Sequence, residues 1–247
     1  MRLGADPEIF LQRNGQVHSA IGYIGANKWE PLQIPDMMKG FTLQEDNVAL
    51  EYGIPPAASQ QEFIDSILSV IKKSREWLPK DVSFSNLSCA RFPEKELTHP
   101  DALRFGCEPD YNAWTRKVNP RPKSPDWRLR SAGGHVHIET QLPKNKVVKA
   151  CDLFLGVASV LMDSQGAERR VLYGKPGAHR PKPYGVEYRT LSNFWIFTPE
   201  LIGWVCRNTQ RALEFDGVVP IAVRNCIAHN DVQLARTLVN EYSLEVL

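Results

Sequence analysis

The chain has 247 residues, of which 43% are hydrophobic and 23% are charged, a composition that suits a folded globular protein with a sizeable core. Its 30 basic and 28 acidic residues give a formal charge of +2, which argues against a general attraction to nucleic acid or to an anionic membrane. The five cysteines include no CxxC pair, and we recognise neither a signal peptide nor a membrane-spanning run, so we expect a single domain, residues 1–247, in a reducing cytoplasm.

Two β-hairpins are predicted near the start of the sequence. Residues 3–12 and 16–25 have the pattern of two strands joined at Asn14-Gly15, a pair that accepts the positive φ angles of a tight turn. A second hairpin is expected within residues 40–54, around a short turn rich in acidic and amide side chains. The chain therefore begins inside a sheet.

A helix, a strand and a long loop follow. Residues 59–78 predict an amphipathic helix, because Ser59 and Glu62 form a capping box before an apolar stripe at helical spacing. Residues 82–92 predict a strand. The stretch 98–130 is rich in Pro, Arg, Trp and Tyr and has little periodicity, so we expect a long loop that could act as a lid.

The last hundred residues predict mainly helices. Residues 146–162 are apolar nearly all round, which indicates a buried helix. Thr198-Pro199-Glu200 predicts the start of another helix that continues to Ala212, and residues 232–239 predict a short final one. Strands followed by helices indicate an α+β fold.

Isolated polar side chains recur on one face of several predicted strands. In RSAGGHVHIET, residues His135, His137 and Glu139 share a face, because successive side chains of a strand point to opposite sides. Charges within apolar runs are costly to bury unless they are paired or bound to a metal ion. We therefore infer that these strands meet around a cation. The other side chains that the same pattern selects are Asp6, Glu8, Glu51, Glu187 and Arg189.

The ligand types narrow the choice of metal. Carboxylates and imidazoles without thiolate suit Mg²⁺ or Mn²⁺ when phosphates complete the coordination, whereas Zn²⁺ would also accept an HxH pair with a carboxylate. The spacing of these residues in the sequence does not distinguish Mg²⁺ or Mn²⁺ from Zn²⁺. Many basic side chains near the predicted site favour phosphoryl transfer, in which metal ions and guanidinium groups neutralise developing charge. These basic residues are Arg169, Arg170, Lys175, Arg180 and Arg189.

Each of these residues also has a purely structural interpretation. A glutamate in a strand, such as Glu51, is often solvated at an edge, and Asp6 next to a proline could simply shape its strand. Arg169 and Arg170 could complement the dipole at the end of a helix. Cys107 would be a nucleophile only beside a placed base, and the sequence indicates none.

Six motifs taken together resemble the phage-type COOH-NH2 ligases, a branch of the glutamine synthetase-like amidoligases. They span residues 4–195 and read GADPEIF, EDNVALEYGIPPA, GCEPDYNAW, SAGGHVHI, RRVLYGKPGAHRPK and YGVEYRTLSNFW. The resemblance implies an α+β fold with a curved, mainly antiparallel sheet, a polar concave face and helices on the convex face. It also implies ATP and Mg²⁺, or Mn²⁺, as cofactors.

The same resemblance implies roles for particular residues. His137 would approach a nucleotide phosphate. The chemistry of the side chains adds that Arg169, Arg170, Lys175 and Arg180 would bind phosphate or a substrate carboxylate, because Arg matches planar oxyanions with two parallel hydrogen bonds. The implied catalytic group is Arg189, Arg170 and Glu187, with Arg189 on the transferred phosphoryl group. The implied metal ligands are Glu8, Glu51, His135 and Glu187, together with Asp6, which stands where glutamine synthetases have another glutamate.

We therefore expect an ATP-dependent ligase that forms an amide through an acyl phosphate, from a small-molecule or peptide carboxylate and an amine, in the host cytoplasm if a phage encodes it. Two alternatives stay open. One is a zinc-dependent hydrolase that uses His135, His137 and the carboxylates, and the other is a non-catalytic nucleotide- or peptide-binding module. The sequence does not name the acid or the amine, and it leaves open the number of metal ions and whether the chain forms a homo-oligomer.

Overall fold

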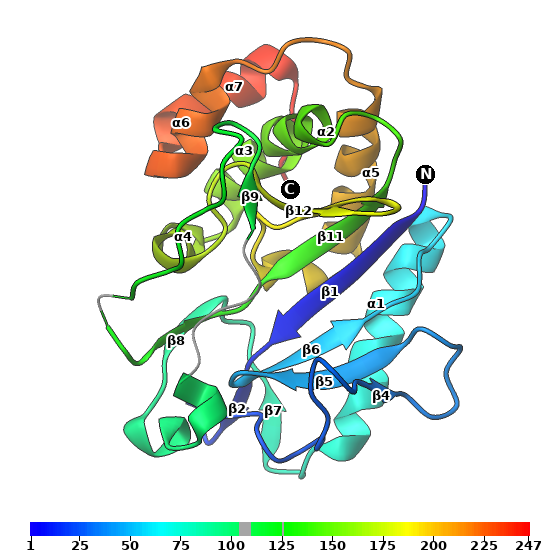
Figure 1. The fold of residues 1–247 in the computed structure, drawn as a ribbon, viewed down its shortest axis with the longest axis vertical. Helices are drawn as coiled ribbons and strands as arrows, with labels where there is room; N and C mark the ends of the chain where they lie inside the picture. Colours follow the sequence, from blue (N-terminus) through cyan, green and yellow to red (C-terminus); the bar gives the residue numbers. More distant parts are fainter. Residues whose placement is uncertain (104–109, 125) are drawn as a thin grey trace.

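A sheet of eight strands forms the centre of the protein, whose computed structural model describes residues 1–103, 110–124 and 126–247 (Figure 1). All the strand pairs in this sheet are antiparallel. This confirms the expected α+β class with a large antiparallel sheet. The order across the sheet is β4 (Leu32–Gln33), β5 (Thr42–Asp46), β6 (Ala49–Gly53), β1 (Leu3–Ile9), β11 (Gly134–Glu139), β13 (Gly185–Tyr188), β12 (Ala178–Lys182) and β9 (Tyr111–Asn112).

Both predicted hairpins are confirmed at their turns. Asn14 and Gly15 have φ angles of 51° and 75°, as the tight turn between β2 (Leu11–Arg13) and β3 (Gln16–His18) requires. Asn47, with φ 55°, turns the chain between β5 and β6.

The strand predicted over residues 16–25 is wrong beyond His18. The chain leaves the sheet there because Glu45 binds it as a loop, accepting hydrogen bonds from the backbone N–H groups of Ile24 at 2.7 Å and Gly25 at 3.0 Å.

Two small sheets extend one end of the molecule. The strand predicted over residues 82–92 is in fact two short strands, β7 (Val82–Phe84) and β8 (Cys89–Arg91). They belong to different sheets: β7 pairs with β2, and β8 pairs with β10 (Leu129–Ser131). The segment between them leaves one sheet and enters the other.

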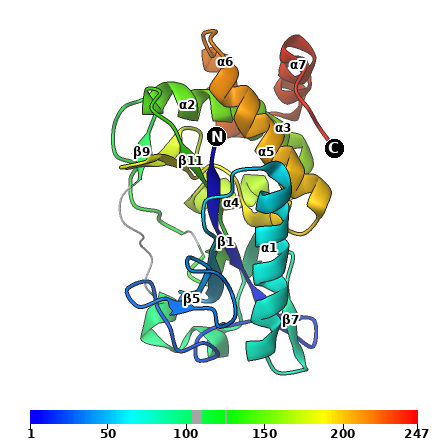
Figure 2. The ribbon, with the colours of Figure 1, turned by 90° about the vertical axis from the view of Figure 1, so that its right-hand side faces the viewer.

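Helices cover one face of the central sheet (Figure 2). The predicted helix over 146–162 exists, but a π-helical turn interrupts it, so that it consists of α2, η4 and α3. The helices α4 and α6 were not predicted. The helical elements are α1 (Gln60–Ser74), η1 (Arg75–Trp77), η2 (Glu94–Leu97), η3 (Pro100–Leu103), α2 (Lys144–Cys151), η4 (Asp152–Gly156), α3 (Val157–Met162), α4 (Gly166–Leu172), η5 (Asn193–Ile196), α5 (Pro199–Glu214), α6 (Ile221–His229) and α7 (Val232–Tyr242).

Apolar side chains of the sheet pack against these helices. Val136 and Ile138 of β11 and Val186 of β13 are fully buried in the main core. Phe63 of α1 stacks on Trp195 with ring centroids 6.0 Å apart. Because strand side chains alternate, the residues between these apolar positions point to the opposite face. That face is therefore the polar one.

The long segment 98–130 crosses the edge of the sheet. Its residues Tyr111–Asn112 form β9, which pairs with β12 as the last strand of the sheet. The rest of its described part is irregular apart from η3 and the start of β10. In the described part of the chain, no helix is both long enough and apolar enough to span a membrane.

Candidate functional site

Side chains from neighbouring strands meet on the polar face of the sheet. Asp6 of β1 lies directly opposite His135 of β11, and His137 of β11 lies opposite Glu187 of β13. Directly opposed residues of an antiparallel pair point to the same face. The structure thus brings these four side chains together, as the alternation in the sequence predicts.

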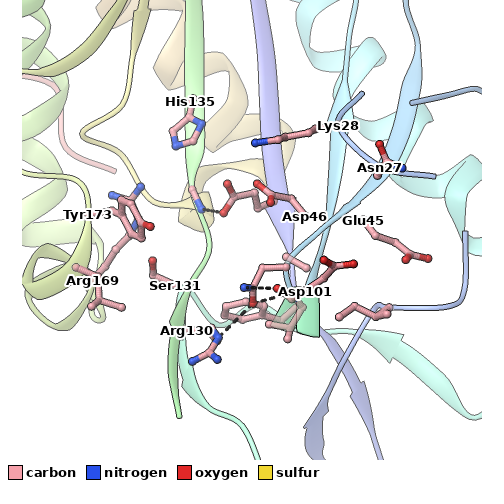
Figure 3. Close-up of a pocket in the computed structure, with 18 of the residues that line it drawn as sticks. Asn27, Lys28, Glu45, Asp46, Asp101, Arg130, Ser131, His135, Arg169 and Tyr173 are labelled. Atoms are coloured by element: carbon pink, nitrogen blue, oxygen red, sulfur yellow. Dashed lines mark hydrogen bonds between the residues drawn. The ribbon is translucent and has the colours of Figure 1, made fainter. Parts of the chain in front are cut away.

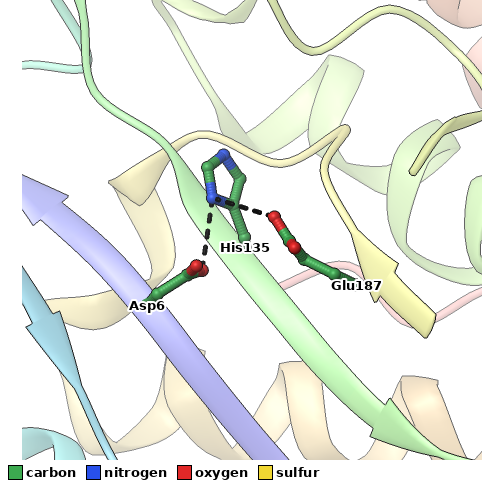
Figure 4. A group of neighbouring side chains, drawn as sticks. All are labelled: Asp6, His135 and Glu187. Atoms are coloured by element: carbon green, nitrogen blue, oxygen red, sulfur yellow. Dashed lines mark ion pairs between the residues drawn. The ribbon is translucent and has the colours of Figure 1, made fainter. Parts of the chain in front are cut away.

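Asp6, His135 and Glu187 form a group of possible metal ligands (Figure 4). One donor atom from each lies within 4.8 Å of the others. His135 Nδ1 is 3.2 Å from Asp6 Oδ1 and 3.9 Å from Glu187 Oε1. The three side chains come from β1, β11 and β13 and point toward one another. Such a group can bind a cation.

Glu187 is surrounded by positive charge. Its side chain is fully buried and contacts Arg189 directly, with Arg180 at 3.4 Å and Lys182 at 2.9 Å. Burial and Asp6 would raise the pKa of Glu187, but the positive charges of Arg189 and Arg180 outweigh them and lower it to about 2. Glu187 is therefore a carboxylate at every physiological pH.

The two histidines differ in environment. Burial, together with the charge of Arg189, lowers the pKa of His135 to about 4, so its ring is neutral and can act as a ligand. His137 Nε2 lies 3.2 Å from Asp6 Oδ2, and its Nδ1 lies 2.5 Å from the hydroxyl of Tyr184. Burial disfavours the charged ring, but Asp6 and Glu187 outweigh burial and raise the pKa of His137.

A second acidic group lies beside the first. Glu8 of β1 is opposite Glu51 of β6, and Asp46 of β5 is their neighbour. Burial and repulsion from Asp46 raise the pKa of Glu8 to about 7, although the backbone N–H of Gly133 donates to its carboxylate at 2.7 Å. Burial, and then Asp6, Asp46 and Glu8, raise the pKa of Glu51. These carboxylates repel one another without a cation.

The donor atoms fit a divalent cation. Among the described residues, Asp6 Oδ1, His137 Nε2 and Glu187 Oε2 are buried and make no hydrogen bond. The close approach of Lys182 to Glu187 Oε2 lacks hydrogen-bond geometry. Buried polar atoms that make no hydrogen bond are costly, and a bound cation would satisfy the two carboxylate oxygens. Carboxylate oxygens with one imidazole suit Mg²⁺ or Mn²⁺, and Zn²⁺ accepts the same donors.

The glycines of SAGGHVHI make room for the site. A Cβ on Gly133 would lie 2.4 Å from His135 Nε2. A Cβ on Gly134 would lie 2.3 Å from the Ser192 carbonyl oxygen and 2.4 Å from Trp195 Nε1. The motif thus lets β11 approach the 192–195 segment, which carries a backbone oxygen that cannot easily move.

Gly134→Ala is expected to lower the free energy of unfolding by about 1–3 kcal/mol, because the new methyl group overpacks against backbone. Gly4→Ala in the adjacent strand is the matched control, since its Cβ would approach no atom closer than 3.4 Å. Urea unfolding of both variants checks the prediction. Equal stability of the two would show that the close approach at Gly134 carries no cost.

A cavity of about 320 Å³ opens next to the acidic groups (Figure 3). His135, Arg169 and Tyr173 lie on one side of it, and Lys28 and Asp46 lie on the other. The cavity therefore combines both signs of charge with an apolar wall, which suits a small polar ligand. Its apolar lining includes Phe10, Ile21, Val48, Ala49 and Leu172.

Arg169 is the cation best placed to bind an anion in this cavity. Its side chain is 2% exposed, Nη1 donates to the Thr190 carbonyl at 3.0 Å, and Nε has no hydrogen-bond partner in the part of the chain that the structure describes. Gly174, with φ +72°, leaves space for it, because a Cβ there would lie 1.8 Å from Arg169 Nη1. Arg130 also lines the cavity, but carbonyl groups such as those of Ala102 and Trp127 already accept its hydrogen bonds.

Not every predicted residue reaches this site. Arg170 points into the helical layer, where it donates to Asn230 at 2.5 Å and to Ser159 at 3.0 Å, and it lines neither described cavity. A direct catalytic contact by Arg170 is therefore not supported. Lys175 lines a smaller cavity of about 30 Å³, which shares Arg189 with the larger one. Cys107 lies outside the described residues.

Several residues of the site were missed by sequence reasoning. Asp46 was assigned to a turn, although it alternates with Gln44 on the polar face of β5. Lys182 and Tyr184 come from the β12–β13 hairpin, whose pairing the sequence did not reveal. Lys28 lies in the loop that departs from the predicted strand.

The sheet places an acidic face, rimmed by arginines and lysines, beside a cavity, an arrangement that can bind a cation and an anion. Residues 117–207 match the family model described as Phage phiEco32-like COOH.NH2 ligase-type 2, which confirms the resemblance to the COOH-NH2 ligases over this segment. The match includes His135, Arg169 and Glu187, whereas Asp6 and Glu8 precede it. It supports a carboxylate–amine ligase that forms amide bonds. A comparison with curated proteins gives no significant match.

Proposed function

We propose that the protein is an ATP- and Mg²⁺-dependent ligase that joins a carboxylate to an amine through an acyl phosphate. The observation that carries this proposal is the juxtaposition of Asp6, His135 and Glu187 with Arg189 and Arg180 beside a cavity. Metal ligands next to guanidinium groups are what phosphoryl transfer needs, because negative charge spreads over the transferred group.

Two groups of residues would hold the metal ions. Asp6, His135 and Glu187 would bind one, and the neighbouring carboxylates Glu8 and Glu51, with Asp46, would bind another. Bound Mg²⁺ would orient the ATP phosphates and neutralise their charge. Burial first, and then repulsion between the gathered carboxylates, raise the pKa of Glu8 and of Glu51, and a cation would relieve the repulsion.

The other side chains would position the reactants. Arg169 would bind a carboxylate of the acid substrate in the larger cavity, since its guanidinium is buried there with an unpaired N–H. Arg189 and Arg180 would contact the transferred phosphoryl group, and His137 would contact a nucleotide phosphate. The acid oxygen attacks the γ-phosphorus, and ADP leaves with the electrons of the broken P–O bond. An amine then attacks the acyl carbon, phosphate leaves with the C–O bonding electrons, and the proton lost by the amine passes to the phosphate.

A hydroxamate assay tests the proposal. The purified protein is incubated with ATP, Mg²⁺, hydroxylamine and pooled carboxylates or short peptides, and hydroxamate and ADP are measured together. Equimolar hydroxamate and ADP, absent in Glu187→Ala, are expected. A protein that purifies with stoichiometric zinc, forms no hydroxamate and cleaves amides without nucleotide would instead be the hydrolase. ATP binding without turnover would indicate the binding module.

A further inference from the structure

Asp152 is a buried carboxylate outside the proposed site. It is the first residue of the π-helical turn η4, and its exposed fraction is 0%. Its Oδ2 accepts from the indole N–H of Trp114 at 2.6 Å, and its Oδ1 accepts from the hydroxyls of Tyr188 at 2.9 Å and Thr190 at 3.2 Å. Burial raises the pKa of Asp152 to about 7, although these donors lower it. A buried carboxylate needs such partners, so the cluster is built around it.

Two of these partners flank Arg189. Tyr188 and Thr190 stand on either side of it in the chain, and their hydroxyls point to the helix-covered side of the sheet. Arg189 points to the polar face, where it contacts Glu187 and lies 3.2 Å from His135 Nδ1. Asp152 therefore restrains the backbone on both sides of Arg189 from the helix-covered side of the sheet.

The third partner belongs to the segment 110–122, which we call the edge segment. Trp114 packs against Gly177, where a Cβ would lie 2.6 Å from the indole, and the Ala113 N–H donates to the Gly177 carbonyl at 2.9 Å. Asp110, at the start of the segment, lies on the polar side with its carboxylate 3.8 Å from Arg189 Nε. Further along, Asn119 and Arg121 line the smaller cavity together with Arg189. The edge segment thus contacts Arg189 on the polar side of the sheet and Asp152 on the helix-covered side.

We propose that Asp152 is a positioning residue, which fixes Arg189 and the edge segment relative to each other through its hydrogen bonds to Tyr188, Thr190 and Trp114. It does not touch the substrate. Only the kinetic consequence rests on the proposed ligase function, because the geometry itself can be tested without activity.

The chemistry of the three partners predicts which substitutions are tolerated. An indole N–H is only a donor, whereas a hydroxyl can donate or accept. In Asp152→Asn the amide oxygen can accept from Trp114, and its NH₂ can donate to the hydroxyls of Tyr188 and Thr190 after they rotate. Asp152→Ala removes the acceptor of Trp114 and of Tyr188, whereas the Thr190 hydroxyl can still donate to the Lys175 carbonyl at 3.2 Å. Trp114→Phe keeps an aromatic ring but removes the donor to Oδ2.

Hydrogen exchange measures the proposed restraint directly. The amides of Asn112, Arg116 and Asn119 donate backbone hydrogen bonds within the edge segment. Their exchange should therefore be slow in the wild-type protein, so that an acceleration in a variant can be measured. Exchange at residues 110–119 is expected to accelerate about tenfold or more in Asp152→Ala and Trp114→Phe, and to stay near wild type in Asp152→Asn. If Asp152→Ala does not fold, Trp114→Phe decides the question.

A matched control separates local positioning from general stability. Asn208 is also fully buried, and its side chain donates to Glu245 and to the Trp204 carbonyl, both at 2.9 Å, without lining either described cavity. Asn208→Ala should therefore leave exchange in the edge segment unchanged. Rates in Asp152→Ala and Trp114→Phe within twofold of wild type, or the same acceleration in Asn208→Ala, would overturn the proposal.

The ligase assay adds a second measurement. Hydroxamate formation by Asp152→Ala and Trp114→Phe is expected to fall about tenfold in kcat with little change in the KM for ATP, because a misplaced guanidinium weakens the transition state more than nucleotide binding. Asp152→Asn should recover most of the activity. If the wild-type protein forms no hydroxamate, the ligase function is refuted. The positioning role of Asp152 is then tested by hydrogen exchange alone.

Discussion

Glu187→Gln is expected to reduce ATP-dependent hydroxamate formation about a thousandfold or more, the largest effect of any single substitution that we anticipate. Glu187 contributes to the proposed metal site with Asp6 and His135, and it also fixes Arg189, Arg180 and Lys182. The amide retains the shape of the side chain but loses the charge that both functions need. Steady-state kinetics with Mg²⁺-ATP and the identified acid measures the loss.

The experiment needs checks on folding and on general charge. Removing one member of a buried ion pair costs about 3–5 kcal/mol, so circular dichroism and thermal unfolding must show that Glu187→Gln remains folded. Glu139→Gln is the matched control, because Glu139 lies on β11 and its only ion pair among the described residues is with Arg2 at 4.0 Å. A folded Glu187→Gln with activity within tenfold of the control would refute the central role given to Glu187.

Alternation within strands correctly predicted which side chains share the polar face, because it depends on backbone geometry alone. A side chain two residues away points to the same face whatever the strand pairs with. Asp6 with Glu8, His135 with His137, and Glu187 with Arg189 could therefore be grouped before any pairing was known. Which strands are neighbours is a tertiary property, and the order of the strands was not predicted; that the charged strands meet was inferred from the cost of burying isolated charges.

Helical residues show where sequence reasoning stopped. Arg169 and Arg170 are adjacent in α4, and successive helical side chains point about 100° apart, so both cannot face one site. Arg169 faces the cavity, and Arg170 faces Ser159 and Asn230. Recognising α4 as a helix would have shown that only one of the two arginine side chains could face the site. Its seven residues, starting at a glycine, gave too weak a pattern.

Asp46 shows a different kind of error. Its position beside Asn47 suggested a turn, since acidic and amide side chains favour turns. The strand β5 nevertheless continues through Asp46, and its carboxylate joins Glu8 and Glu51. Both a turn and a metal-binding site favour an acidic residue at this position. Only the tertiary structure distinguishes these two explanations. The same holds for Asp152, which the sequence places in an ordinary buried helix.

Glu8→Gln is expected to stabilise the metal-free protein at high pH while it strongly reduces ligation. The pKa of Glu8 is raised from its ordinary value to about 7 by burial and by Asp46. Between pH 4.5 and about 7 the folded state therefore holds a proton that the unfolded state has lost, and this residue's contribution to stability falls as the pH rises. Glutamine has no proton to lose. In EDTA, the variant should match wild type near pH 5 and exceed it by about 2–3 kcal/mol at pH 8.

Magnesium should make the wild-type protein more stable than Glu8→Gln at pH 8, the reverse of the order in EDTA. In the wild-type protein a cation near Glu8 and Glu51 would replace repulsion with coordination, so Mg²⁺ should raise the melting temperature, and more at pH 8 than at pH 6, where Glu8 must first release a proton. Glu8→Gln should respond much less and lose activity about a hundredfold or more. Comparing the difference between variant and wild type at each pH cancels the titration of groups that do not interact with Glu8. A variant that is less stable than wild type in EDTA at pH 8, or that keeps the full response to Mg²⁺, would show that these carboxylates are not gathered to bind a metal ion.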